Sequence, residues 1–164
     1  MTRDTPPQRR RGRHLPTREE LRIWRDFVET AETLQHELST RLQRDCSLSP
    51  GDYRVLLALS EAPEQRVRSS QLADAIDWTR SRLSHHLGRM ERRALIRRAE
   101  PADDSRGAEV ILTPTGAEAF HGATVPHLGA VRELFVEALT PEQLAAVGEV
   151  TAALRARLGS SRTT

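Results

Sequence analysis

The segment from Trp78 to Arg98 holds the densest group of side chains suited to binding chemistry in this chain of 164 residues. Its local charge is +6, in a chain of net charge +2, because one acid, Glu91, opposes seven arginines: Arg80, Arg82, Arg89, Arg92, Arg93, Arg97 and Arg98. Guanidinium groups bind phosphates and guanine edges through paired hydrogen bonds, and Ser or His side chains bond base edges or phosphates. A solvated helix face usually mixes both signs of charge, so this excess favours a DNA-binding surface over an ordinary exposed one.

The spacing of apolar residues places these groups on a helix. At about 100° per residue, Leu83, Leu87 and Met90 share one face, and Thr79 precedes the helix as a candidate cap. The other faces carry small, hydrogen-bonding or cationic residues, which suit entry into the major groove because bulky ones would block the approach. We expect DNA contacts from Thr79, Arg80, Ser81, Arg82, Ser84, His85, Arg89 and Arg92, with Arg80 and Arg92 supporting the grip on the backbone.

Two neighbouring elements must position this helix. Residues Ser69 to Ile76 predict a short amphipathic helix, separated from it by a tight turn. Residues 95–100 and 108–112 read as two short strands that form a ribbon. A helix, a turn, an Arg-rich second helix and a ribbon, in that order, predict a winged helix-turn-helix, which is a device for reading DNA.

The loop between the predicted strands, residues 101–107, is polar and rich in turn-forming residues. It holds Arg106, which at a wing tip can enter the narrow minor groove, where the potential is most negative. Asp104 is placed to hold that guanidinium by a charge-assisted hydrogen bond. Taken alone, an exposed turn with a surface ion pair explains the two residues equally well; their position after the Arg-rich helix favours the DNA interpretation.

This ordered set of motifs resembles the MarR (multiple antibiotic resistance regulator) family of transcription factors. The resemblance rests on residues 69–76, 81–91, the triplet Asp104-Ser105-Arg106 and residues 110–116, and it covers about Thr17 to Leu158. It implies a homodimeric regulator of double-stranded DNA, more often a repressor than an activator. It also implies release by a small, often aromatic or phenolic effector bound between the winged helix and the dimer arms.

One position departs from that family pattern. Ala94 stands where relatives usually have Gly after the second helix of the motif. A left-handed helix stop costs Ala roughly 1 kcal/mol more than Gly. The helix therefore either ends differently here, or the chain carries that cost.

Helices at both ends exceed what the winged helix can cover. From Thr17 to about Asp45 the apolar spacing is helical over about 40 Å, and Thr17 with Glu20 forms a capping box. Residues 113–158, with a charge of −2, predict two more helices, with Pro126 expected to kink or break the first near Thr124. Their surplus apolar faces predict an intertwined two-fold dimer. Its two reading helices would lie about one DNA turn apart, on a pseudopalindromic operator.

The expected fold is mainly α-helical with a small β-hairpin. Residues 1–16 are expected to form a disordered Arg-rich tail and 160–164 a disordered end. Residues 17–46 and 113–159 form the dimerisation arms around a winged helix-turn-helix domain at 47–112. In that domain Ser49 and Pro50 start a largely buried support helix, followed by a polar link at 61–67. No apolar run approaches the roughly 18 residues of a membrane span, so we expect a cytoplasmic protein with no membrane partner.

Other chemistry has little support. The sequence has no Gly-rich phosphate loop, no Cys pair and no catalytic constellation, so we expect neither an enzyme nor a metal cofactor. A metal site would need His36, His121 and His127 to converge in space. The single cysteine, Cys46, is either a peroxide-sensing thiol or, more often at such a position, a small packing residue.

A small organic effector is the one non-protein ligand expected besides DNA, and the sequence does not name it. Trp24, Phe27, Tyr53 and Trp78 are the candidate cleft residues, although each suits a core position better. The alternative function is a winged-helix protein-interaction module, which would use the same Arg-rich helix against an acidic partner without preferring any DNA sequence.

Overall fold

The computed structural model describes residues 15–99 and 108–159. The predicted N-terminal tail (apart from Leu15 and Pro16), Asp104, Arg106 and the predicted C-terminal end lie outside this range. The chain forms two compact units, with the boundary between Gln35 and His36. Helix α1 (Arg18–Cys46) continues across that boundary.

The predicted start of α1 is confirmed. The Thr17 amide donates to Glu20 Oε2 at 2.7 Å, and the Glu20 amide donates to Thr17 Oγ1 at 3.2 Å. In the first unit the large apolar side chains near the start of this helix remain exposed, with exposed fractions of 62% for Trp24 and 51% for Phe27, whereas Val28, Ala31 and Leu34 are half-buried. The start of the apolar stripe is therefore without a covering surface in the described chain.

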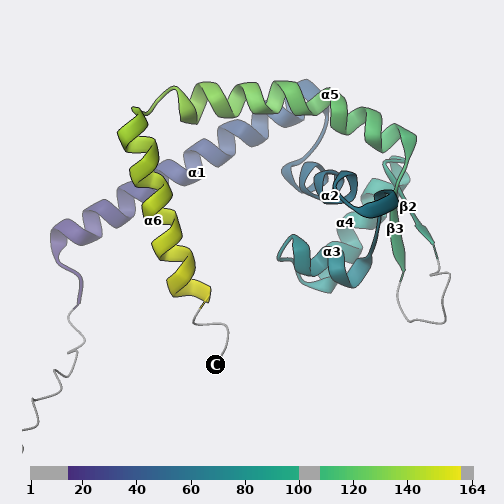
Figure 1. Ribbon diagram of the computed structural model, residues 1–164, viewed down its shortest axis with the longest axis horizontal. Coiled ribbons are helices and arrows are strands. Elements are labelled where there is room, and N and C mark those ends of the chain that lie inside the picture. The colour runs from purple at the N-terminus through teal and green to yellow at the C-terminus, as the bar shows by residue number, and fades with distance from the viewer. Residues whose placement is uncertain (1–14, 100–107, 160–164) are drawn as a thin grey trace, which may run out of the picture. The chain divides into compact units, whose positions relative to one another are not determined.

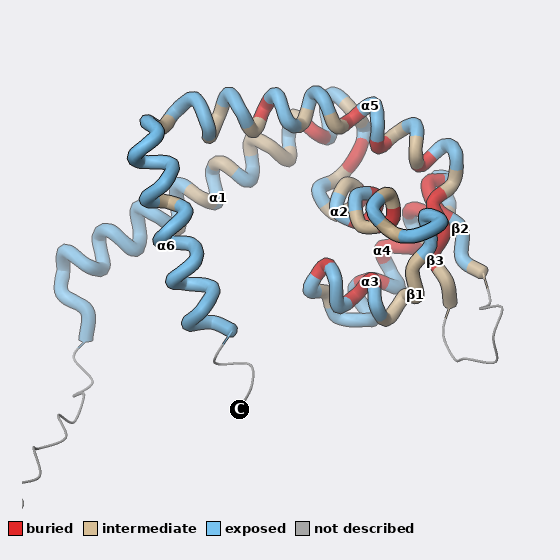
Figure 2. The backbone as a smooth tube through the Cα atoms, in the orientation of Figure 1, coloured by how far each residue is buried: buried red, intermediate tan, exposed pale blue. Residues whose placement is uncertain are grey.

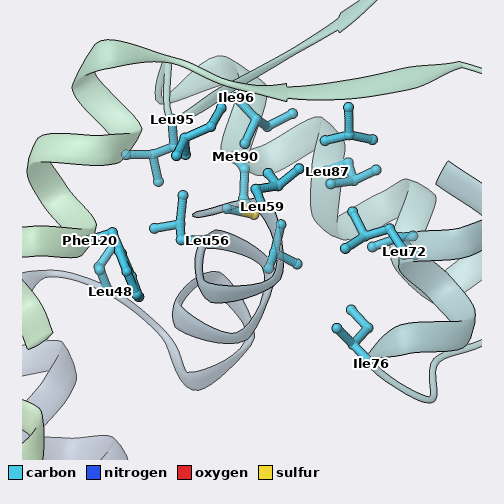
Figure 3. Packing of buried hydrophobic residues seen from close by; sticks show 14 of the residues in the cluster. Leu48, Leu56, Leu59, Leu72, Ile76, Leu87, Met90, Leu95, Ile96 and Phe120 are labelled. Carbon is cyan, nitrogen blue, oxygen red and sulfur yellow. The ribbon is translucent and has the colours of Figure 1, made fainter. Parts of the chain in front are cut away.

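In the second unit, the end of α1 is followed by the expected support helix, α2 (Pro50–Ser60). Ser49 caps it in a reciprocal arrangement with Asp52, and Pro50 occupies the first turn, as expected. Val55, Leu56 and Leu59 are buried, whereas Leu57 points outward. Figure 3 shows Leu56 and Leu59 of this helix packed with Met90 and Leu87 in the apolar core.

The β-structure is larger than predicted. The expected two-stranded ribbon is an antiparallel sheet of three strands in the order β1-β3-β2, comprising β1 (Arg66–Arg68), β2 (Ile96–Ala99) and β3 (Glu109–Leu112). The segment expected to be only a polar link holds the short helix η1 (Pro63–Gln65) and the start of β1. A strand of three residues is too short to show an alternating pattern, and its pairing with β3, Val67 opposite Val110, stabilises it from outside.

Helices α3 (Ser69–Ala75) and α4 (Arg80–Arg92) form the helix-turn-helix (Figure 1). The turn between them contains Asp77 in a left-handed conformation, with φ 54°, and the Trp78 amide closes it onto the Ala73 carbonyl at 2.9 Å. Leu83, Leu87 and Met90 are buried, which confirms the predicted inner face of α4. This packing fixes which side of α4 faces outward.

Helix α5 (Pro114–Val131) starts at the predicted Thr113 cap, whose Oγ1 accepts from the Gly116 amide at 3.0 Å. Of the predicted kink or break near Thr124, the break is wrong, because the helix continues through Pro126 to Val131. A proline removes one backbone donor, and burial of Ala123 before it and Ala130 after it holds the helix together. The irregularity comes later, as a π-helical turn, η2 (Arg132–Val136).

Helix α6 (Pro141–Gly159) follows the predicted capping box, in which the Thr140 amide donates to Gln143 Oε1 at 2.9 Å. It buries none of its residues, and Figure 2 shows it exposed along almost its whole length. Leu144, Val150, Leu154 and Leu158 are among its exposed apolar residues. Within residues 15–99 and 108–159, no helix is long and apolar enough to cross a membrane.

Candidate nucleic-acid interface

The outward surface of α4 contains all the described DNA-contact candidates. The residues Thr79, Arg80, Ser81, Arg82, Ser84, His85, Arg89 and Arg92 are all exposed. Thr79 also fulfils its predicted capping role, because its Oγ1 accepts from the Arg82 amide at 3.3 Å. The structure therefore presents one polar, cationic face on a helix whose opposite face is buried, and contact with DNA remains a prediction for each residue.

Internal ion pairs reduce the charge that this surface can offer. Arg98 binds Glu91 through its Nε atom at 2.9 Å and through Nη2, and these bonds lower the pKa of Glu91. Arg93 turns away to Asp52. In the described part of the chain Arg80, Arg92 and Arg97 have no ion pair, which leaves their guanidinium groups available to phosphates.

A hollow of about 370 Å³ opens beside this face, between α3, α4 and the sheet. Its polar lining consists of three guanidinium groups and three hydroxyl groups, from Arg68, Arg80, Arg98, Ser69, Ser70 and Ser84. Such donors suit phosphate oxygens. Sequence reasoning missed Arg68 because β1 was not expected, and Arg98 because its strand was considered only as part of the wing.

Behind α4 lies a buried polar cluster that sequence reasoning also missed. Asp52 is 4% exposed and His86 is 6% exposed, and His86 Nε2 lies 2.9 Å from Asp52 Oδ1. Asp52 also accepts from the Ser49 amide at 2.9 Å and from Arg93 Nη1 at 2.8 Å. Burial alone would raise the pKa of Asp52, but the close contact with His86 and the bonds from Ser49 and Arg93 outweigh it and hold the pKa well below its usual range. The carboxylate is therefore ionised.

A sequence signal for this cluster existed. His86 falls in the apolar stripe of α4, three residues after Leu83 and four before Met90. A polar group in such a stripe needs a buried partner. The sequence did not show which residue would supply it, because Asp52 belongs to a different helix.

Two of the exposed arginines are attached to this cluster. Arg89 Nη2 lies 2.8 Å from His86 Nδ1. The Trp78 ring meets the His86 ring edge-on with centroids 5.1 Å apart, and the Arg82 guanidinium carbon lies 4.3 Å from the Trp78 ring centroid. The buried side of α4 therefore contacts the side chains that project from its exposed side.

The four effector-cleft candidates occupy different surroundings. Trp24 and Phe27 lie on the exposed stripe of α1 in the first unit. In the second unit Tyr53 packs on the rings of Phe120 and His127, with centroids 5.2 and 4.6 Å away, while Trp78 packs on His86. Tyr53 and Trp78 thus both pack against the apolar core, each with different aromatic neighbours, and an effector role for any of the four remains a prediction.

Neither a peroxide-sensing role of Cys46 nor a metal site at the three histidines gains support from the described residues. Cys46 packs against the core, and burial followed by the nearby charge of Asp45 raises the pKa of its thiol, whereas a sensor needs a thiolate. Among the described residues no three His, Cys, Asp or Glu side chains gather as a metal site, and these include His36, His121 and His127. Burial instead lowers the pKa of His127, beside Tyr53.

A helix-turn-helix with an outward cationic second helix, backed by an antiparallel wing sheet, defines a winged-helix DNA-binding protein. The MarR family model matches residues 47–107. The transcriptional regulator HosA of Escherichia coli O157:H7 is 33% identical over 117 residues, which cover 71% of this chain and 79% of HosA.

Solved structures agree with this class. AbsC, a MarR family regulator from Streptomyces coelicolor, is 35% identical with a TM-score of 0.82, covering 92% of this chain and 99% of AbsC. Sco3205 from the same organism, solved in complex with DNA, is 37% identical with a TM-score of 0.82, covering 88% of this chain and 94% of Sco3205. The chain belongs to the MarR family and is a DNA-binding transcriptional regulator.

Proposed function

We propose that this regulator acts in the cytoplasm as a homodimeric, effector-responsive repressor that places α4 in successive major grooves of a pseudopalindromic operator. The observation that supports this best is the outward face of α4, where every described contact candidate is exposed. Ser81, Arg82, Ser84, His85 and Arg89 read bases or adjacent phosphates, and Arg80 and Arg92 hold the backbone. In the wing, outside the described residues, Arg106 enters the minor groove with Asp104 orienting it.

The dimer proposal rests on apolar surface without a cover. Trp24 and Phe27 of α1 and Leu154 and Leu158 of α6 are all more than two-fifths exposed in the single chain. Side chains of this size are stabilised by removal from water, at about 1.5–3 kcal/mol each when fully buried. Residues 17–46 and 113–159 therefore serve as the dimerisation arms around the winged-helix domain at 47–112.

The effector that we propose is a small aromatic molecule. A regulator of the same fold, at 17% identity, TM-score 0.75 and coverage of 88% of this chain and 87% of that one, was solved with 2,4-dichlorophenol bound. In this chain the candidate contacts are Trp24, Phe27, Tyr53 and Trp78. The effector must bind one dimer arrangement better than the other, because a ligand shifts only an equilibrium whose states it binds differently.

The test is fluorescence anisotropy of the purified protein on its own upstream intergenic DNA against a scrambled duplex, across a salt series. Sequence-preferring binding, with a negative log-log salt slope of about 0.9 per phosphate neutralised, supports the proposal. Binding that is weak and indifferent to sequence contradicts an operator in this DNA, so that either the operator lies elsewhere or the partner is a protein.

Variants locate the interface. Arg82→Ala and His85→Ala should reduce the preference for operator over scrambled DNA, and Arg106→Ala should weaken binding to both. Arg54→Ala is the matched control, because this exposed arginine belongs to α2, outside α4, the wing and the proposed dimerisation arms. Wild-type binding by all three interface variants would show that the wrong face was chosen.

A further inference from the structure

The residue that joins the buried and exposed sides of α4 is His86. Its ring is buried, yet its two nitrogens face different groups, Asp52 Oδ1 at 2.9 Å and Arg89 Nη2 at 2.8 Å. A guanidinium group can only donate hydrogen bonds, so His86 Nδ1 must accept from Arg89. Nε2, on the other side of the ring, lies 2.9 Å from Asp52 Oδ1, a close contact without the alignment of a hydrogen bond. Arg89, His86 and Asp52 therefore form a continuous line of close contacts.

The far end of this chain is fixed. Asp52 belongs to the first turn of α2, where it accepts from the Ser49 amide, and Arg93 at the end of α4 binds its second oxygen, Oδ2, at 2.8 Å. Gly51 closes the space on the same side, because a Cβ there would lie 2.7 Å from His86 Cε1 and 2.9 Å from Trp78 Cη2. The His86 ring is therefore held by both charge and shape.

From this fixed ring the contacts extend to the outward face. Arg89 is bonded to the ring directly, and Arg82 stacks on Trp78, whose own ring rests against His86. A long flexible side chain that is already oriented loses less rotamer freedom when it binds a ligand. Arg82 and Arg89 both belong to the surface that reads DNA under the proposed function.

We propose that His86, held by Asp52, is a positioning residue that orients Arg89 directly, and Arg82 through Trp78, for operator recognition. This inference rests on the proposed function of the α4 face. Loss of the positioning should weaken operator binding by about 2- to 10-fold, the effect of leaving one such side chain unoriented. The loss should be smaller on scrambled DNA, where fewer groups need a defined orientation.

A double-mutant cycle tests the direct branch. His86→Phe keeps a ring against Trp78 and removes both nitrogens; operator affinity is measured for wild type, His86→Phe, Arg89→Ala and the double variant. His86→Phe should weaken binding in the wild-type background and have little further effect once Arg89 is absent. Arg92→Ala is the matched control background, since Arg92 is an exposed arginine of the same helix without a contact to His86. In that background His86→Phe should lower operator affinity by as much as it does in the wild type.

A second variant separates positioning from folding. His86→Asn keeps an acceptor oxygen near the place of Nδ1 but loses most of the ring, so it should melt below His86→Phe while binding the operator more tightly. The inference is overturned if His86→Asn, which melts lower, also binds the operator more weakly than His86→Phe. It is also overturned if His86→Phe lowers operator affinity by the same factor with and without the Arg89 side chain. If Arg89→Ala alone binds like wild type, the proposed reading role of Arg89 fails first, and the inference fails with it.

Discussion

Replacement of Ala94 by Gly should stabilise this protein. Ala94 has φ 55°, in the left-handed region, directly after α4. Its amide donates to the Glu91 carbonyl at 2.9 Å, and the Leu95 amide donates to the Met90 carbonyl at 3.1 Å. These two bonds form the hydrogen-bond pattern of a Schellman helix stop, in which Gly is the usual residue. The sequence left open whether the helix ends differently here or Ala94 adopts the left-handed conformation at a cost in stability. The structure shows the second.

The size of the effect follows from two opposing contributions. An L-residue in the left-handed region costs about 1–2 kcal/mol, which Gly avoids. Gly adds about 0.4–1 kcal/mol of conformational freedom to the unfolded chain, which opposes the gain. Because the side chain of Ala94 is exposed, little packing is lost. The net increase in unfolding free energy is about 0.5–1 kcal/mol, or roughly 1–4 °C in Tm for a chain of this size.

The same substitution at a helical position supplies the control. Ala152 is exposed in the interior of α6, where Ala→Gly should cost about 1 kcal/mol. Thermal and urea unfolding by circular dichroism should be run at one protein concentration, because dimerisation contributes to stability. Opposite signs at the two positions support the assignment of strain. A loss at Ala94 equal to that at Ala152 would refute it.

Three further predictions test the site and the arms. Gly88→Ala should raise Tm, because its Cβ meets nothing within 4 Å and Ala favours helix by about 1 kcal/mol, yet it should weaken operator binding measured by anisotropy, since the methyl group lies on the outward face. The depressed pKa of Asp52 means that its ionised form stabilises the fold above about pH 4, and that this contribution is lost on further acidification. Asp52→Asn should therefore lower Tm at pH 7 and make the decrease of Tm below pH 4 less steep. Asp45→Asn, at an exposed carboxylate, should change the Tm at pH 7 and the decrease below pH 4 much less. Leu154→Glu should shift the protein from dimer to monomer in light scattering, while Ala152→Glu, on the opposite side of α6, leaves the dimer intact.

The elements that sequence reasoning predicted correctly are those specified by local information. Capping residues Thr17, Ser49, Thr113 and Thr140 each mark a helix start because their bonds reach only three residues along the chain. The repeat of Leu83, Leu87 and Met90 likewise requires only the helical period. These signals were enough to predict the helix-turn-helix and the outward face of α4.

The features that were missed depend on contacts across the chain. Strand β1 exists because it pairs with β3, more than forty residues later, and α5 passes through Pro126 because the helix is anchored by buried Ala123 before it and buried Ala130 after it. The Asp52–His86 pair joins two helices whose separate sequences show only a capping acid and a histidine in an apolar stripe. Their distance in space is set by the fold, and no local pattern contains it.

The same contacts change how the charge of α4 should be understood. Counting arginines from sequence treats each as free, but Arg98 is paired with Glu91, and Arg93 serves the buried carboxylate of Asp52. Removing Asp52 would therefore leave Arg93 without its ion-pair partner and His86 without its anchor, although Asp52 itself is buried away from the exposed surface. A substitution in α2 can then alter DNA recognition without touching DNA. Under this reasoning Asp52→Asn should lower operator affinity even at a temperature where the variant is fully folded.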